Sequence, residues 1–205
     1  MSIAIDTTLK RHSFMAITLY GSIPSPYVRR IRMLLEGQDY QFEVVDLYND
    51  EARAEYAKLN PLKKMPMMIN GEQKLYDSHV IAQYLQHKFN LAPPSFDELN
   101  LVSGVDAVVD SLIVIFYGKR SEFEISKDKL IFQLQLERIP DVLTWLNEQA
   151  KQGGFNHWGY ASIALVSFVN WVEFRNLYDL TPYKDLLAAV DLHRERAIVK
   201  STMPT

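Results

Sequence analysis

The hydrophobic pattern of the chain changes once, near residue 90, and this change limits the folds open to it. Before that point, short apolar runs that suit buried strands alternate with stretches of helical period. After it, the periodic stretches are all helical. A chain whose strand signals all come early cannot build one sheet through the whole molecule. We therefore expect an α/β domain followed by an all-α domain.

The first part predicts the element order β-α-β-α-β-β-α. Asn70-Gly71 lies between the last two strand signals and favours a tight antiparallel hairpin. The two earlier helices indicate parallel βαβ crossovers, so we expect a small sheet covered by helices. The expected strands are 16–20, 42–47, 67–69 and 74–76, and the expected helices are 26–36, 51–59 and 78–88.

The second part predicts helices only, with breaks at Gly153-Gly154 and Thr181-Pro182. The expected helices are 97–117, 126–152, 162–177 and 182–199. The predicted organisation is a tail over 1–15, the α/β domain over 16–90, a Pro-containing linker over 91–96 and the helical domain over 97–205.

Composition removes several classes of protein. The 205 residues are 48% apolar and 23% charged, which is typical of a globular protein, and they include no cysteine. Disulfides, thiolate metal sites and catalysis by a protein thiol are therefore excluded. The net charge of −3 gives no indication of a nucleic-acid surface.

Neither a metal site nor a membrane span is expected. The five histidines show no ligand spacing, which favours surface or capping roles. The longest apolar runs, 105–117 and 163–172, are too short to cross a bilayer, and residues 1–15 lack the apolar core of a secretory signal. We therefore expect a cytoplasmic protein with no metal, no nucleic-acid partner and no membrane partner.

Three short segments carry groups that suit ligand binding. Ser25 precedes Pro26 at a predicted helix start, where it suits an N-cap or a hydroxyl facing an anionic sulfur. Met65-Pro66 enters a strand, and a cis bond there would free the Met65 backbone for an extended peptide. Asp77 and Ser78 precede a helix, where they suit a cap or the two ends of an amino-acid zwitterion.

Together these segments resemble a known family. The runs LYGSIPSPYVRR, NPLKKMPMMINGE and LYDSHVIAQYL are similar, in order and spacing, to the N-terminal domain of soluble glutathione S-transferases. The helical half fits the same family. The resemblance implies a thioredoxin-like domain that binds glutathione, an all-α domain that shapes the pocket of a small hydrophobic electrophile, and a homodimer.

The resemblance also assigns roles by position. It matches Ser25 to the residue beside the glutathione sulfur, Met65 to the residue whose backbone pairs with the cysteinyl unit, and Pro66 to a cis proline. Asp77 and Ser78 match the acidic-Ser pair that holds the γ-glutamyl end.

Two of these roles have competing candidates. Ser22 is the competing hydroxyl for the sulfur. Lys64 is our candidate for contacting a carboxylate of glutathione, with Arg53 as the alternative.

The implied activity is conjugation of glutathione to an electrophile, with Ser25 stabilising the thiolate. Since Ser25 is not a cysteine, mixed-disulfide reductase chemistry is disfavoured. A glutathione-dependent peroxidase and a non-catalytic binding or regulatory module remain as alternatives. The pocket of the second substrate is left unassigned, because aromatic residues at helical spacing are more often core; they are Phe116, Tyr117, Trp171 and Phe174.

Overall fold

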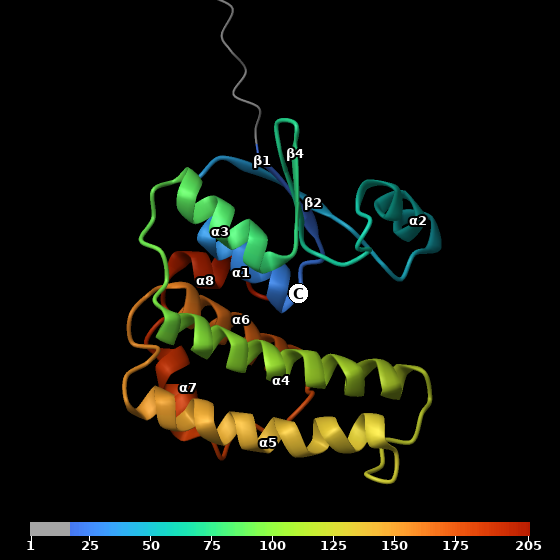
Figure 1. Cartoon of the computed structure of the whole chain (residues 1–205), viewed down its shortest axis with the longest axis vertical. Helices are drawn as coiled ribbons and strands as arrows, with labels where there is room; N and C mark the ends of the chain where they lie inside the picture. Colours follow the sequence, from blue (N-terminus) through green and yellow to red (C-terminus); the bar gives the residue numbers. More distant parts are fainter. Residues whose placement is uncertain (1–16) are drawn as a thin grey trace, which may run out of the picture.

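Two domains follow one another in the computed structural model, which describes residues 17–205 (Figure 1). The predicted element order is confirmed, while the expected tail and the first residue of the first expected strand lie outside the described residues. The first domain consists of β1 (Ile17–Gly21), α1 (Pro26–Leu34), β2 (Tyr40–Val44), α2 (Asp50–Leu59), β3 (Met67–Asn70), β4 (Gln73–Tyr76) and α3 (Ser78–Lys88). The second consists of α4 (Phe96–Arg120), α5 (Leu130–Lys151), α6 (Tyr160–Arg175), α7 (Lys184–Asp191) and α8 (Ala197–Ser201).

The strand order of the sheet is β2-β1-β3-β4, and one of the two predicted crossovers is wrong. β1 and β2 are parallel, but β3 runs antiparallel to β1. Gly21 pairs with Val44 and Tyr20 with Met67, so the chain leaves β2 and enters β3 at the same end of the sheet. The α2 segment stays at that end instead of returning along the sheet, which reverses the direction of β3.

α1 and α3 lie between the sheet and the helical domain (Figure 1). Ser25 caps the start of α1, and Pro26 occupies its first turn, as the sequence predicts. The apolar side of α1 includes Val28 and Ile31, which have no exposed surface. The opposite side of α1 packs on α6 of the helical domain, so this helix contacts both domains.

This placement of α1 also buries two of its three arginines. Arg29 and Arg30 are both fully buried. Arg29 Nη1 donates to Asn170 Oδ1 at 2.8 Å and Nη2 donates to the Val199 carbonyl at 2.9 Å, which ties α1 to α6 and α8. Burial and then the neighbouring charge of Arg32 lower the pKa of Arg29 to about 10.

α4 is the central helix of the second domain and packs against both α5 and α6. Of the helices in residues 17–205, α4 is the one that is long and apolar enough to cross a membrane. It has 25 residues, and the mean hydropathy of its most apolar segment is 1.9. The sequence analysis had judged a membrane span here from the apolar run 105–117 alone, which is shorter than this helix. Half of the most apolar segment is buried within the protein, which accounts for its apolar character.

Several boundaries differ from the prediction. β2 begins at Tyr40, and α6 begins at Tyr160, so Ser162 lies inside the helix and accepts from the Gly159 N–H at 3.0 Å. The helix expected over 182–199 is broken between α7 and α8, where the buried His193 side chain lies 2.9 Å from the Phe155 carbonyl. No Gly or Pro marks this break in the sequence.

The absence of a side chain at Gly21 allows β1 to lie close to α1. A Cβ on Gly21 would overlap Val28 Cγ2 and lie 2.8 Å from Val28 Cγ1. We expect Gly21→Ala to lower the free energy of unfolding by about 1–3 kcal/mol, measured by urea denaturation. In a Val28→Ala background the same change should cost far less, because the clashing methyl groups are gone. Equal costs in the two backgrounds would contradict this account.

Candidate functional site

Three segments meet at one end of the sheet. Tyr20 of β1 pairs with Met67 of β3, which in turn pairs with Tyr76 of β4. The residues that follow Tyr20 and Tyr76 and those that precede Met67 therefore lie at the same edge. The register brings together the three segments that the sequence analysis singled out.

Ser25 lies in the first of these segments. Its Oγ accepts from the Val28 N–H at 3.3 Å, and its own N–H donates to the Ser22 carbonyl at 3.2 Å. A hydroxyl has one proton to donate and two lone pairs. Ser25 therefore caps α1 and still has its O–H available for an acceptor in front of the helix.

The second segment contains the Met65–Pro66 peptide bond, which is cis, as expected from the resemblance. Met65 Sδ accepts from the Ser22 N–H at 3.1 Å and so links the first two segments. Pro66 is buried, while Met65 is half-buried.

Two residues that the sequence analysis missed hold the chain just before Met65. Asn60 is fully buried, and its Nδ2 donates to the Lys64 carbonyl at 2.5 Å. Tyr56 of α2 donates its hydroxyl to the same carbonyl at 2.8 Å. The sequence analysis ended the helix at residue 59 and gave Asn60 no role, although an asparagine directly after a helix is a sequence signal for a side chain that bonds to nearby backbone.

The third segment begins α3. Asp77 is exposed, caps the helix by accepting from the His79 N–H at 2.8 Å, and has a left-handed backbone with φ of 73°. Ser78 is buried at the first turn of the helix. The capping role that the sequence offered for Asp77 is therefore present, and the free carboxylate oxygen is still exposed.

A cavity of about 520 Å³ lies in front of the first two segments, between the two domains. Its volume falls within the roughly 300–1,000 Å³ of small-molecule sites. Ser22, Ser25, Lys64 and Met65 all line it, whereas Asp77 and Ser78 lie outside its lining. Lys63 also lines it. Arg53 does not; it donates to Asp50 of α2 at 2.6 Å.

The helical domain supplies the facing wall of the cavity. Phe116 and Tyr117 of α4 and Trp171 of α6 line it, so three of the four aromatic residues considered to be core contribute to a cavity. Phe174 is not among the lining residues and is 43% exposed. Burial raises the pKa of Tyr117, with a further contribution from Tyr48.

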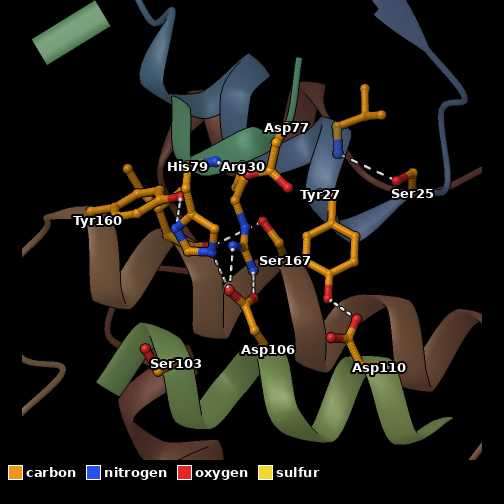
Figure 2. A network of polar contacts seen from close by, with 12 residues as sticks. Ser25, Tyr27, Arg30, Asp77, His79, Ser103, Asp106, Asp110, Tyr160 and Ser167 are labelled. Carbon is orange, nitrogen blue, oxygen red and sulfur yellow. Dashed lines mark hydrogen bonds and ion pairs between the residues drawn. The ribbon is translucent and has the colours of Figure 1, made fainter. Parts of the chain in front are cut away.

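A partly buried polar network, shown in Figure 2, joins the start of α3 to the helical domain. Arg30 Nη2 donates to Asp106 Oδ1 at 2.5 Å, and His79 Nε2 lies 2.7 Å from Asp106 Oδ2. The Tyr160 hydroxyl lies 3.4 Å from His79 Nδ1. The expectation of a surface or capping role is wrong for the buried His193, whereas the His79 side chain is 41% exposed and also contacts Asp106. Asp106 lies 27 residues from His79 and 76 residues from Arg30 in the sequence, so no local pattern indicates these pairs.

Opposing effects set the charge states in this network. Burial disfavours the ionised carboxylate of Asp106, but its contacts with His79 and Arg30 outweigh this and lower its pKa. Burial raises the pKa of Tyr27, whose hydroxyl donates to Asp110 Oδ1 at 2.5 Å. The network therefore contains an ionised Asp106 opposite a charged Arg30, next to neutral tyrosines.

Within residues 17–205 no group of three or more His, Asp or Glu side chains is arranged to hold a metal ion. The polar groups around the cavity are hydroxyls, backbone groups, two lysines, an arginine and the carboxylates of Asp46 and Asp110. These groups suit an anionic or peptide-like organic ligand.

The fold consists of a thioredoxin-like domain joined to a helical domain, with a cavity between them. Residues 19–94 match the family model described as "Glutathione S-transferase, N-terminal domain". The uncharacterized GST-like protein YibF of Escherichia coli is 28% identical over 172 residues, which cover 78% of this chain and 83% of that protein. A glutathione S-transferase of Hyoscyamus muticus is 32% identical over 134 residues, covering 63% of this chain and 60% of that protein.

The same fold occurs in a solved glutathione S-transferase of Methylobacillus flagellatus with glutathione bound. It superimposes with a TM-score of 0.81 at 24% identity over 93% of this chain and all of that one. Residues 19–94 therefore belong to the N-terminal domain family of the glutathione S-transferases, and the chain shares its fold with a solved member of that family.

The Arg30–Asp106 pair makes a prediction about stability. Asp106→Asn leaves a fully buried guanidinium without its counter-charge, and we expect a loss of about 3–5 kcal/mol near neutral pH in urea unfolding. Because the folded-state pKa of Asp106 is lowered, its contribution is present above the unfolded value of about 3.9 and is lost as pH falls through the folded value. The difference in stability between the two proteins should therefore begin to shrink below about pH 4 and vanish only below the lowered folded-state pKa of Asp106.

Asp110→Asn provides the control, because Asp110 is an exposed carboxylate one turn further along α4. An asparagine there can still accept from Tyr27, so we expect a change within about 0.5 kcal/mol. A loss in Asp106→Asn no larger than in this control would refute the proposed importance of the pair.

Proposed function

We propose that this protein is a glutathione transferase that conjugates glutathione to small hydrophobic electrophiles. The observation that carries the proposal is the position of the Ser25 hydroxyl, which faces the cavity between the domains from the start of α1. The cavity has room for the thiol of glutathione on one side and an electrophile on the other. The match of residues 19–94 to the N-terminal domain of glutathione S-transferases supports glutathione as the co-substrate.

Ser25 has enough stabilising capacity for the proposed role. A thiol has a pKa of about 8.5, and lowering it by two units requires about 2.7 kcal/mol of preference for the thiolate. A hydrogen bond to a charged group contributes roughly 1.5–3 kcal/mol, and a helix N-terminus adds ~0.3–1 kcal/mol. The hydroxyl and the first turn of α1 together supply the required preference, without a metal.

The remaining groups at this edge suit the ends of the peptide. The backbone of Met65, which precedes the cis Pro66, pairs with the cysteinyl unit in this proposal. Asp77 accepts from the γ-glutamyl ammonium, and Ser78 with the first N–H groups of α3 holds the γ-glutamyl carboxylate. Lys64 binds the other carboxylate, which its position in the cavity lining favours over Arg53.

The proposal extends to the setting of the enzyme. We expect a cytoplasmic homodimer that needs no metal. The same thiolate would also serve peroxide reduction, and a protein that binds glutathione without turning over either substrate would be a binding or regulatory module. A panel of electrophiles and hydroperoxides, assayed beside calorimetric glutathione binding, separates these three outcomes.

Ser25→Ala should raise the pKa of the bound thiol by about one to two units, because the mutant loses a hydrogen bond to a charged sulfur. The measurement is a pH titration of thiolate absorbance in the glutathione complex. The mutant should also lose about 1 kcal/mol of stability, since the same hydroxyl caps α1.

Ser22→Ala is the matched control, because Ser22 lines the same cavity without capping α1. We expect it to leave the thiol pKa unchanged. A shift in Ser22→Ala with none in Ser25→Ala would move the role to Ser22, and no shift in either would end the serine mechanism.

Asp77→Asn should weaken glutathione binding about tenfold by calorimetry, because it removes the charge that faces the ammonium. Asparagine caps helices as well as aspartate does, so the stability of the fold should not change. The ligand control is glutathione that lacks its α-amino group. If Asp77→Asn weakens binding of this analogue equally, the carboxylate does not contact the ammonium.

A further inference from the structure

Two arginines flank one aromatic ring in the helical-domain wall of the cavity. Arg175, the last residue of α6, lines the cavity, and its guanidinium carbon lies 5.8 Å from the centroid of the Phe116 ring. Arg120, the last residue of α4, lies 5.7 Å from the same ring and 4.2 Å from the ring of Tyr48. Phe116 and Tyr48 both line the cavity.

Neither arginine has a carboxylate partner among the salt bridges of residues 17–205. Each one ends a helix, where the carbonyl groups favour a cation, and this explains either residue alone. It does not explain why two cations share one ring in a cavity wall. A bound anion near this ring would be attracted by both positive charges.

The charges around the cavity also favour an anion. The chain has a net charge of −3, yet three cationic side chains line this cavity, namely Lys63, Lys64 and Arg175, against the carboxylates of Asp46 and Asp110. Asp110 already accepts from Tyr27. It also precedes Phe116 by six residues on α4, which separates these two residues by about 9 Å along the helix axis.

The surface beside Arg175 is apolar and aromatic. Ile113 and Phe116 of α4 and Trp171 of α6 line the same wall, with Trp171 one turn before Arg175. Flat apolar faces of this kind suit an aromatic ring. A guanidinium at the edge of such a surface suits a carboxylate, with which it can form two parallel hydrogen bonds.

We propose that the second substrate is an aromatic electrophile that carries a carboxylate, and that Arg175 pairs with this group. The inference rests on the proposed conjugation by glutathione. With a chloronitroarene, the thiolate sulfur attacks the ring carbon that bears chlorine, a C–S bond forms, and the C–Cl bond breaks. Chloride leaves with the bonding electron pair, and the carboxylate stays ionised and unchanged as the anchor.

A matched pair of electrophiles tests the proposal. A chlorodinitrobenzoate and its methyl ester share the reacting carbon and differ in the charged group. The measured quantity is kcat/KM for the acid divided by kcat/KM for the ester, each corrected for its uncatalysed rate. This ratio is compared between the wild type and Arg175→Gln. Arg175→Gln should lower this ratio about tenfold, because it removes one charged hydrogen-bond partner, while the rate for the ester stays close to that of the wild type.

Two further variants separate charge, geometry and folding. Lys119 is exposed, lies outside the cavity lining and precedes Arg120 at the end of α4. Lys119→Gln removes one positive charge there and should leave the ratio for acid and ester unchanged. Arg175→Lys keeps the charge and should retain part of the preference. Thermal unfolding of each variant shows whether the fold is intact.

A binding measurement distinguishes failure of this inference from failure of the proposed function. The two S-aryl conjugates of glutathione, acid and ester, are prepared chemically and titrated into the wild type and Arg175→Gln by calorimetry. Tighter binding of the acid conjugate, lost in Arg175→Gln, supports the inference even if turnover is absent. Equal binding of both conjugates, or a preference that Arg175→Gln leaves unchanged, overturns it and leaves glutathione binding intact. Failure of glutathione and both conjugates to bind overturns the proposed function and this inference with it.

Discussion

Arg30 of α1 has no exposed surface and is paired with Asp106 of α4. Burying this guanidinium costs free energy that its pairing with the Asp106 carboxylate offsets, so α1 and α4 must lie in register for the pair to form. α1 also presents Ser25 at its first turn. The position of the candidate sulfur-facing hydroxyl therefore depends on a helix of the other domain.

The neighbouring arginine restricts α1 in a different way. Arg29 is satisfied by a side-chain amide and backbone carbonyls of α6 and α8, with no carboxylate among the hydrogen-bond partners that the structure gives it. Hydrogen bonds to carbonyls depend on direction more than a charge pair does, so they define the rotation of α1 about its axis. Together the two arginines fix both the distance and the orientation of the helix that separates the sheet from the helical domain.

The sequence revealed features that are encoded locally. The Asn70-Gly71 hairpin, the Ser25-Pro26 helix start and the cis Met65–Pro66 bond were all expected from adjacent residues or from a resemblance carried by short motifs. The direction of β3 was not predicted correctly, because a run of apolar residues identifies a strand without giving its direction. The Arg30–Asp106 pair was missed for a related reason: charges on a predicted helix are normally solvated, and only the docking of the second domain buries these. The wall around Phe116 and Trp171 follows the same rule, since helical spacing alone does not separate a core aromatic from one that faces a cavity.

Tyr56 is the one residue of α2 that is buried, and it also donates to the Lys64 carbonyl. α2 lies to one side of the sheet in Figure 1 and has few apolar contacts to lose. Segments of this kind open locally at a free-energy cost below that of global unfolding. When α2 detaches, the Tyr56 contact breaks and the Lys64–Met65 floor of the cavity loses one of its two anchors. A ligand paired to the Met65 backbone would hold α2 in place. Binding in the cavity and slow amide exchange in α2 would therefore both report the equilibrium between attached and detached α2.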